Sequence, residues 1–254
     1  MSILEVENLS TCYSNRQVLN NISFNLNEGE WLMIAGPNGA GKSTLAKALT
    51  KGIAYTGKVS LCGTDIQRLS SKNIAKKIGL LSQKHSPGYA FSVYELVELG
   101  RYSHSTNGSV TLNDNIAVQN AIKITGLEQL AERSVLTLSG GELQRAFLAQ
   151  LFAQNPQIMI LDEPANNLDI NFQKLMLDLV GRWLDENKTR AVIMIVHDLS
   201  IALKYGTHAL ILKDGETVSY GNIKKALASE NLNFTFEMNV PQYMHDLLNE
   251  WNNI

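Results

Sequence analysis

Two kinds of hydrophobic pattern follow one another along the chain. Residues 4–7 and 22–27 alternate between apolar and polar side chains, and the second stretch ends at a Glu-Gly turn. Alternation with a period of two predicts half-buried strands. Later runs are apolar throughout, at residues 31–35, 158–161 and 191–196. Continuous apolar runs are typical of strands that are covered on both faces in a parallel sheet flanked by helices.

The stretch between the first and second apolar runs, residues 92–154, has helical character. Ser92 is followed three residues later by Glu95, the spacing of a capping box, and Thr111 begins a second helical segment. Pro156 closes this block. We therefore predict one α/β domain with a core of residues 1–83 and 155–221 that begins with antiparallel strands, a helical insertion of residues 84–154, and a short C-terminal tail of residues 222–254.

Composition narrows the class of protein. Of 254 residues, 44% are hydrophobic and 18% are charged, as in an ordinary globular domain. The apolar runs are far shorter than the roughly 18 residues that a membrane span needs, and the acidic, alternating N-terminus is unlike a signal peptide. A formal net charge of −2 argues against nucleic acid as the main partner. Cys12 and Cys62 lack metal-ligand spacing, which is typical of reduced thiols in a cytoplasmic protein.

Residues 36–43 follow the pattern G-x-x-x-x-G-K-[ST], directly after an apolar strand and directly before a helical segment. Backbone N–H groups of such a loop point at a phosphate chain, and the helix N-terminus adds its positive dipole. In this pattern Lys42 reaches the β- and γ-phosphates, and the Ser43 hydroxyl ligates Mg²⁺. We expect a nucleoside triphosphate to be bound by Gly36, Pro37, Asn38, Gly39, Ala40, Gly41, Lys42, Ser43 and Thr44.

An acidic pair ends the next apolar strand. Residues 158–161 deliver Asp162 at the carboxyl end of the strand, where α/β sheets place their ligands. We expect Asp162 to hold Mg²⁺, directly or through water. The turn after the strand would let Glu163 face the γ-phosphate and act as general base for the attacking water. The plain alternative is a strand that ends in two solvated carboxylates.

Residues 138–145 read LSGGELQR and closely resemble the signature sequence of ABC-type ATPases. Ser139, Gly140 and Gly141 offer N–H groups and a hydroxyl at the start of a helix, which makes an anion site. The alternative is a Ser-Gly-Gly turn that binds nothing. Because the phosphate-binding loop, the signature and the acidic strand occur in the family's order, the chain is identified as a member of the ABC ATPases. The resemblance extends from about residue 3 to residue 221 and implies a P-loop NTPase core with a helical insertion.

The resemblance assigns roles to four residues that carry little signal alone. Gln83 matches the Q-loop glutamine, a ligand of Mg²⁺ or water, and His197 matches the switch histidine, which contacts the γ-phosphate and the attacking water. Tyr13 stands where the family stacks an aromatic ring on adenine. Asp169 ends a D-loop in which two asparagines replace the usual small residues. Without the resemblance these positions would be polar surface, a structural histidine or a core tyrosine. The implied cofactors are ATP and Mg²⁺.

The resemblance also implies partners. The family works as a head-to-tail dimer in which Ser139 of one cassette closes on the ATP held by Lys42 of the other, so we expect a homodimer or a paired homologue. Transmembrane permease subunits would hold the cassette at the cytoplasmic face of the cell membrane as a peripheral subunit. A substrate-binding protein would act indirectly, and nucleic acid is not expected to bind.

Residues 99–104 resemble the G-R-Y-P-H stretch of ATPases that serve importers of ferric siderophores, haem and cobalamin, with Ser103 in place of the proline. The His-Asp-Leu sequence at 197–199 is typical of the same group. An alternative is a soluble ABC ATPase scaffold, such as one for iron–sulfur cluster assembly. ABC proteins of DNA repair or translation fit poorly, because they usually carry two cassettes, long coiled coils or basic surfaces. The plain alternative for Arg101 and His104 is a solvated helix end, and both residues stay outside the catalytic set.

In importers of this family a short permease helix docks between the core and the helical insertion, beside the Q-loop. The matching segment here is residues 83–101, which contains Tyr89, Phe91 and Tyr94 close together. Aromatic residues are enriched at interface hot spots. We expect at least one of these rings to be exposed in the isolated chain. The alternative is that they pack the insertion onto the core.

Overall fold

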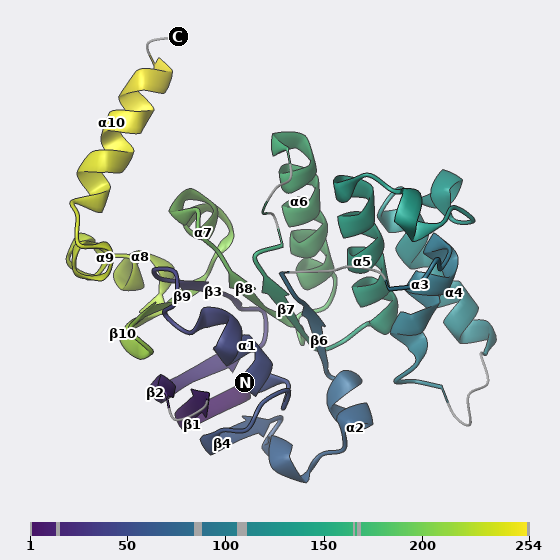
Figure 1. Ribbon diagram of the computed structural model, residues 1–254, viewed down its shortest axis with the longest axis horizontal. Coiled ribbons are helices and arrows are strands. Elements are labelled where there is room, and N and C mark those ends of the chain that lie inside the picture. The colour runs from purple at the N-terminus through teal and green to yellow at the C-terminus, as the bar shows by residue number, and fades with distance from the viewer. Residues whose placement is uncertain are drawn as a thin grey trace. The chain divides into compact units, whose positions relative to one another are not determined.

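The computed structural model describes residues 2–13, 16–83, 88–105, 111–164, 166 and 169–252. These residues form two compact units, one from Met1–Asp65 with Ile195–Ile254 and the other from Ile66–Met194 (Figure 1). Each unit has its own strands, helices and buried side chains.

The N-terminal strands of the first unit form an antiparallel sheet. The strands lie in the order β2-β1-β4-β5, with the bounds β1 (Ser2–Tyr13), β2 (Arg16–Asn27), β4 (Thr56–Leu61) and β5 (Thr64–Asp65). Val6 of β1 pairs with Phe24 of β2 and with Val59 of β4, and all three are buried. Alternate residues therefore face the core, which confirms the half-buried strands predicted from the alternation.

The first unit also contains a parallel strand pair. β3 (Trp31–Ala35) pairs in parallel with β9 (His208–Lys213), and β10 (Glu216–Asn222) pairs with β9 on its other side in the antiparallel sense. Every residue of β3 is buried, as expected of a continuous apolar strand. The helices of this unit are α1 (Lys42–Leu49), α7 (Leu199–Tyr205), α8 (Ile223–Ala226), α9 (Ser229–Phe236) and α10 (Val240–Asn252). The last three lie within residues 222–254.

Parallel strands recur in the second unit. β7 (Ile158–Asp162) lies between β6 (Ile78–Leu81), with which it pairs in parallel, and β8 (Ala191–Ile195), whose last residue belongs to the first unit. All residues of β7 and β8 are buried. A Cβ on Gly79 of β6 would lie 2.2 Å from the side chain of Leu151, so a larger residue there would require that side chain to move. A 3-10 turn (Ile66–Arg68) and α2 (Ser71–Ala75) precede β6, and α6 (Ile170–Glu186) follows β7.

Residues 92–154 form the helical part of the second unit, as predicted. It consists of α3 (Val93–Glu98), α4 (Leu112–Ile124) and α5 (Gly140–Gln154), with 3-10 turns at Leu99–Arg101, Glu128–Leu130 and Val135–Thr137. The three helices lie together (Figure 1) around a core that includes Val118 and Ala149. Ser92 and Thr111 cap α3 and α4 in reciprocal capping boxes, which confirms both predicted helix starts.

Arg101 and His104 hold the end of α3 against the neighbouring helices. The Arg101 Nε donates to Asp114 Oδ1 at 2.8 Å, and its Nη1 donates to the Ala153 carbonyl at 2.7 Å. His104 Nε2 lies 2.8 Å from the Gln154 carbonyl oxygen. The alternative of a solvated helix end is therefore wrong for Arg101, whose side chain is 15% exposed, because the buried carboxylate and carbonyl draw the guanidinium inward.

Candidate nucleotide site

The predicted phosphate-binding loop joins β3 to α1. Gly36 has no room for a Cβ, which would lie 2.0 Å from the Leu212 carbonyl oxygen. Gly41 adopts the left-handed conformation, with φ of 94°, as the N-cap of α1. The first turn of α1, residues 42–45, contains no acidic residue. The loop therefore presents the positive end of a helix with no carboxylate of its own in the first turn, as a phosphate site requires.

Lys42 lies over this loop. Its Nζ donates to the Gly36 carbonyl at 2.8 Å and to the Pro37 carbonyl at 2.9 Å, and the residue is 5% exposed. These two hydrogen bonds orient the ammonium group over the loop, and its contact with a phosphate stays a prediction. Ser43 and Thr44 follow in the first turn of α1 and are half-buried.

Two further candidates of the first unit, Tyr13 and His197, are exposed. Tyr13 ends β1 and is 45% exposed, which is compatible with stacking on a base. His197 follows Val196, whose N–H donates to the Ile34 carbonyl of β3 at 3.1 Å. Asp198 then caps α7 with its side chain. His197 follows the end of the third apolar strand, as expected, and the roles of both residues toward a nucleotide stay predictions.

In the second unit, β7 ends at Asp162 and the chain turns at once. Asp162 is 4% exposed, and Glu163 adopts a left-handed φ of 52°, which is uncommon for a residue with a side chain. This conformation confirms the turn that was expected to release Glu163 from the alternation of the strand. Backbone strain of this kind persists only where the surrounding structure maintains it.

Two side-chain amides hold the carboxylate of Glu163. Gln83 Nε2 and Asn166 Nδ2 both donate to Glu163 Oε2, and the Asn166 N–H donates to the Glu163 carbonyl at 3.2 Å. Because Gln83 donates through its nitrogen, its Oε1 is the atom suited to a cation. The family resemblance predicts Gln83 at this site, whereas Asn166 is noted only as a departure from the D-loop pattern. The sequence feature that could have predicted this contact is the position of Asn166 three residues after Glu163, which is the spacing of a β-turn.

The predicted ligands of Mg²⁺ are oxygen atoms. They are the Ser43 hydroxyl in the first unit, and the Asp162 carboxylate and the Gln83 amide oxygen in the second. Mg²⁺ favours such hard ligands, keeps several waters and is usually bound by one or two carboxylates together with substrate phosphates. Within the described residues there is no cluster of three or more His, Cys, Asp or Glu that would hold a metal by itself. The oxygen donors of each unit are therefore of the kind that binds a magnesium ion together with a nucleotide.

Ser139 caps α5 in a closed capping box. Its backbone N–H and its hydroxyl each lie 2.7 Å from Glu142 Oε2, and the Glu142 N–H donates back to Ser139 Oγ at 3.4 Å. These hydrogen bonds hold the pKa of Glu142 below its ordinary value. Gly140 and Gly141 are the first residues of α5. The predicted helix start is confirmed, and its role as an anion site stays a prediction.

The signature helix α5 contacts the turn that follows β7. Gln144 Nε2 donates to the Pro164 carbonyl at 3.0 Å. The Arg145 guanidinium lies 5.1 Å from the centre of the Phe172 ring in α6, and a Cβ on Gly141 would lie 3.3 Å from the same ring. The start of α5 is therefore held against the segment that carries Glu163.

Two predicted segments lie partly outside the described residues. Of the D-loop, Asn167 and Leu168 are outside, whereas Asp169 caps α6 and accepts a hydrogen bond from the Phe172 N–H at 2.9 Å. Of the docking segment, residues 84–87 are outside. The structure thus gives Asp169 a helix-capping position and leaves its contact with a second cassette a prediction.

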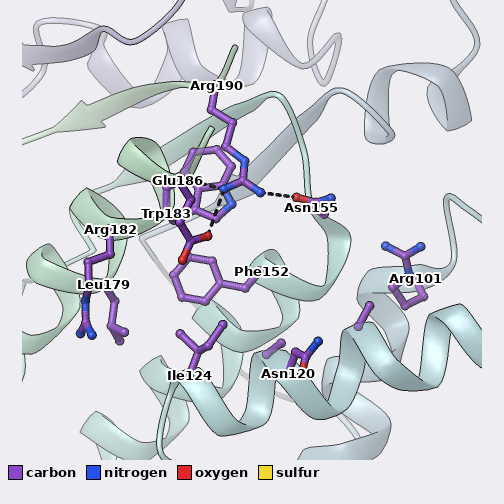
Figure 2. Close-up of a pocket in the computed structure, with 12 residues that line it drawn as sticks. Arg101, Asn120, Ile124, Phe152, Asn155, Leu179, Arg182, Trp183, Glu186 and Arg190 are labelled. Atoms are coloured by element: carbon purple, nitrogen blue, oxygen red, sulfur yellow. Dashed lines mark hydrogen bonds and ion pairs between the residues drawn. The ribbon is translucent and has the colours of Figure 1, made fainter. Parts of the chain in front are cut away.

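A pocket of about 450 Å³ opens between α4, the C-terminal end of α5, and α6 (Figure 2). Its lining comprises Arg101, Ala117, Asn120, Ala121, Ile124, Phe152, Asn155, Leu179, Arg182, Trp183, Glu186 and Arg190. α4 and α6 each contribute residues at i, i+3, i+4 and i+7, so each presents one helix face. Three arginines oppose one glutamate in this lining. Figure 2 shows Arg190 beside Trp183. The Arg190 Nη2 donates a hydrogen bond to Asn155 Oδ1 at 2.8 Å.

The three aromatic rings of the docking segment differ in their surroundings. Tyr89 is 74% exposed, so at least one ring is exposed, as expected. Phe91 and Tyr94 pack against the core of the helical part, and the Tyr94 hydroxyl donates to Asn115 Oδ1 at 3.3 Å. Among the described residues of segment 83–101, Arg101 alone lines the pocket.

Comparison with known proteins agrees with this geometry. The family model described as ABC transporter matches residues 19–166. A cobalamin import ATP-binding protein of Halobacterium salinarum is 35% identical over 238 residues, which are 93% of this chain and 59% of that protein. A ferric enterobactin transport ATP-binding protein of Escherichia coli is 38% identical over 229 residues, which are 89% of this chain and 84% of that protein. The dimeric structure of the ATP-binding cassette MJ0796 in a post-hydrolysis state, bound to ADP and Pi, matches with a TM-score of 0.75 at 26% identity and covers 87% of this chain and 98% of that one.

Proposed function

The chain belongs to the ABC transporter ATP-binding proteins, and we propose that it binds and hydrolyses ATP to energise import of cobalamin, haem or an iron chelate. Its antiparallel strands, parallel strands and helical part are those that the ABC resemblance implies. One relative is named for cobalamin import and another for ferric enterobactin transport. These names support an importer rather than an assembly scaffold.

ATP binds to the first unit through its phosphates. The start of α1 supplies N–H groups and the positive end of the helix dipole, and Lys42 supplies a full charge for the β- and γ-phosphates. Tyr13 stacks on the adenine. Ser43, Asp162 and Gln83 would hold Mg²⁺, which would supply charge neutralisation at the phosphates.

The held carboxylate of Glu163 is the observation that carries the proposal of hydrolysis. Gln83 and Asn166 fix the carboxylate through one oxygen, and a general base must be positioned before it can accept a proton from water in the transition state. Glu163 takes the proton of the attacking water as the water oxygen bonds to the γ-phosphorus. His197 donates a hydrogen bond to the γ-phosphate, and the bond to the β-phosphate oxygen breaks.

The signature completes the site from a second copy. Ser139, Gly140 and Gly141 lie at the start of a helix, which suits a phosphate that approaches from outside the chain. The MJ0796 cassette, which is similar to this chain, is dimeric with ADP and Pi. Two copies related by a two-fold axis would give two equal sites, each with Lys42 from one chain and Ser139 from the other.

The permease helix is proposed to dock beside residues 83–101, where Tyr89 is exposed, and to reach the pocket between α4 and α6 that Arg101 lines. The two helix faces of this pocket suit a short helix laid between them, in the manner of helix-in-groove recognition. Because three arginines face one glutamate, the docked helix is expected to combine apolar residues with an acidic one. Every helix in the described part of the chain is too short or too polar to span a bilayer.

An ATP-trapped dimer tests the proposal. Glu163→Gln removes the base and keeps the shape of the side chain, so turnover should fall by about 10²–10⁴ while ATP still binds. Light scattering should then show a dimer with Mg²⁺ and ATP and a monomer with ADP. A Glu163→Gln protein that hydrolyses ATP at the wild-type rate, or that stays monomeric with ATP, would contradict the proposal.

A further inference from the structure

The start of α5 already binds a carboxylate of the same chain, that of Glu142. Both the N–H and the hydroxyl of Ser139 lie 2.7 Å from the same oxygen of Glu142. A serine hydroxyl has one proton. That proton is donated to the Glu142 carboxylate and cannot at the same time be donated to a phosphate.

The carboxylate of Glu142 is charged at neutral pH. Its hydrogen bonds to Ser139 lower its pKa, and the positive charges of Arg133 and Arg145 lower it further. The positive end of the α5 dipole favours the same charged form. The signature helix therefore begins with a negative charge at the place where the γ-phosphate of a partner's ATP is expected.

We propose that Glu142 is a resident anion that the γ-phosphate of the partner's ATP must displace, so that Glu142 sets the ATP concentration at which two cassettes close. This inference rests on the proposed action of Ser139 in a second copy. Closure brings a phosphate toward a carboxylate of the same sign, and Ser139 must exchange its acceptor from Glu142 to the phosphate. Both steps oppose closure.

The substitution Glu142→Gln removes the negative charge of the side chain and keeps the capping hydrogen bonds at the start of α5. A glutamine accepts the Ser139 N–H through its amide oxygen, and its NH₂ group donates to Ser139 Oγ, which releases the hydroxyl proton for the phosphate. Glutamine is also accepted in capping boxes, so α5 should still begin at the same residue.

The chain offers a matched control in α3. There the Ser92 N–H lies 2.7 Å and its hydroxyl 3.0 Å from Glu95 Oε2, and the Glu95 N–H donates back to Ser92 Oγ at 3.1 Å. Glu95→Gln therefore removes the same charge from the same kind of cap, at a helix that carries no signature sequence.

Both substitutions are made in the Glu163→Gln chain, and the dimer is titrated with Mg²⁺ and ATP under light scattering. Glu142→Gln should lower the ATP concentration at which half of the chains are dimeric by about threefold, since each of two symmetric sites loses a screened repulsion that contributes about that factor. Glu95→Gln should leave it unchanged. At high salt the difference should shrink, because screening weakens interactions between exposed charges.

The possible failures are distinguishable. If the Glu163→Gln parent does not dimerise with ATP, the proposed function falls and the inference falls with it. If the parent dimerises and Glu142→Gln closes at the same ATP concentration, or if Glu95→Gln shifts closure equally, the inference alone is overturned. Thermal unfolding of the two variants reports the loss of each cap. A Glu142→Gln chain that unfolds far below the Glu95→Gln chain would show that Glu142 is structural, which also overturns the inference.

Discussion

The helices α1 and α5 both begin at a sequence that should bind phosphate, yet their first turns are built differently. α1 begins after Gly41, a left-handed residue without a side chain, and its first turn contains a lysine and no acid. α5 begins after Ser139, and the third residue of its first turn is Glu142, which closes back on the cap. The start of α1 has no side-chain cap, whereas the start of α5 is capped by the carboxylate of its own Glu142.

Under the proposed function, the two helix starts would meet the phosphate at different times. A site that must capture ATP before anything else happens gains from a preorganised, cationic helix start. A site that meets the same phosphate only when two chains close gains from a resident partner, because a helix start left without acceptors loses a cap that is typically worth about 1 kcal/mol. The comparison thus predicts that charge changes in α1 alter ATP binding by one chain, whereas charge changes in α5 alter closure of two.

The largest expected effect is at Lys42. Lys42→Ala removes the one cation in the first turn of α1 and its bonds to the Gly36 and Pro37 carbonyls, so ATP affinity should fall on the order of 10²-fold or more. Isothermal titration with Mg²⁺ and ATP measures this. Lys47→Ala removes an equal charge from an exposed position of the same helix and should bind ATP as the wild type does. Equal affinity in all three proteins would mean that α1 is not the phosphate site.

A smaller effect should follow if α1 is given the chemistry of α5. Thr44 is the third residue of α1, the position that Glu142 holds in α5. Thr44→Glu places a carboxylate beside the phosphate site and should weaken ATP binding by about tenfold. Thr44→Gln has the same shape without the charge and serves as the control. If both variants bind ATP alike, the charge of the first turn is not what separates the two helices.

Much of this site follows from short sequence patterns. The glycines and the lysine of the phosphate-binding loop, the buried strand before Asp162 and the helix starts at Ser92 and Thr111 are local features, and the structure shows each of them at the predicted place. Local spacing decides caps and turns, because the groups that meet are three or four residues apart.

Contacts between distant segments did not follow from the sequence. The bonds of Arg101 to Asp114 and Ala153 and the meeting of Gln83 with Glu163 depend on how helices and strands pack. Glu142 is a different case. Its Ser-x-x-Glu spacing is the one that predicts the cap at Ser92, but the family resemblance points Ser139 at an external phosphate rather than at a carboxylate of its own helix.

The most direct test of the account is complementation between two inactive chains. Lys42→Ala should not hold ATP, and Ser139→Arg should hold ATP in its own loop but block closure at the partner's site, so each chain alone should be inactive. A one-to-one mixture forms heterodimers in which one composite site keeps both Lys42 and Ser139, and about a quarter of the wild-type ATPase activity should return if pairing is random. A mixture that is no more active than the separate chains would contradict the claim that the two helix starts meet on one ATP from opposite subunits.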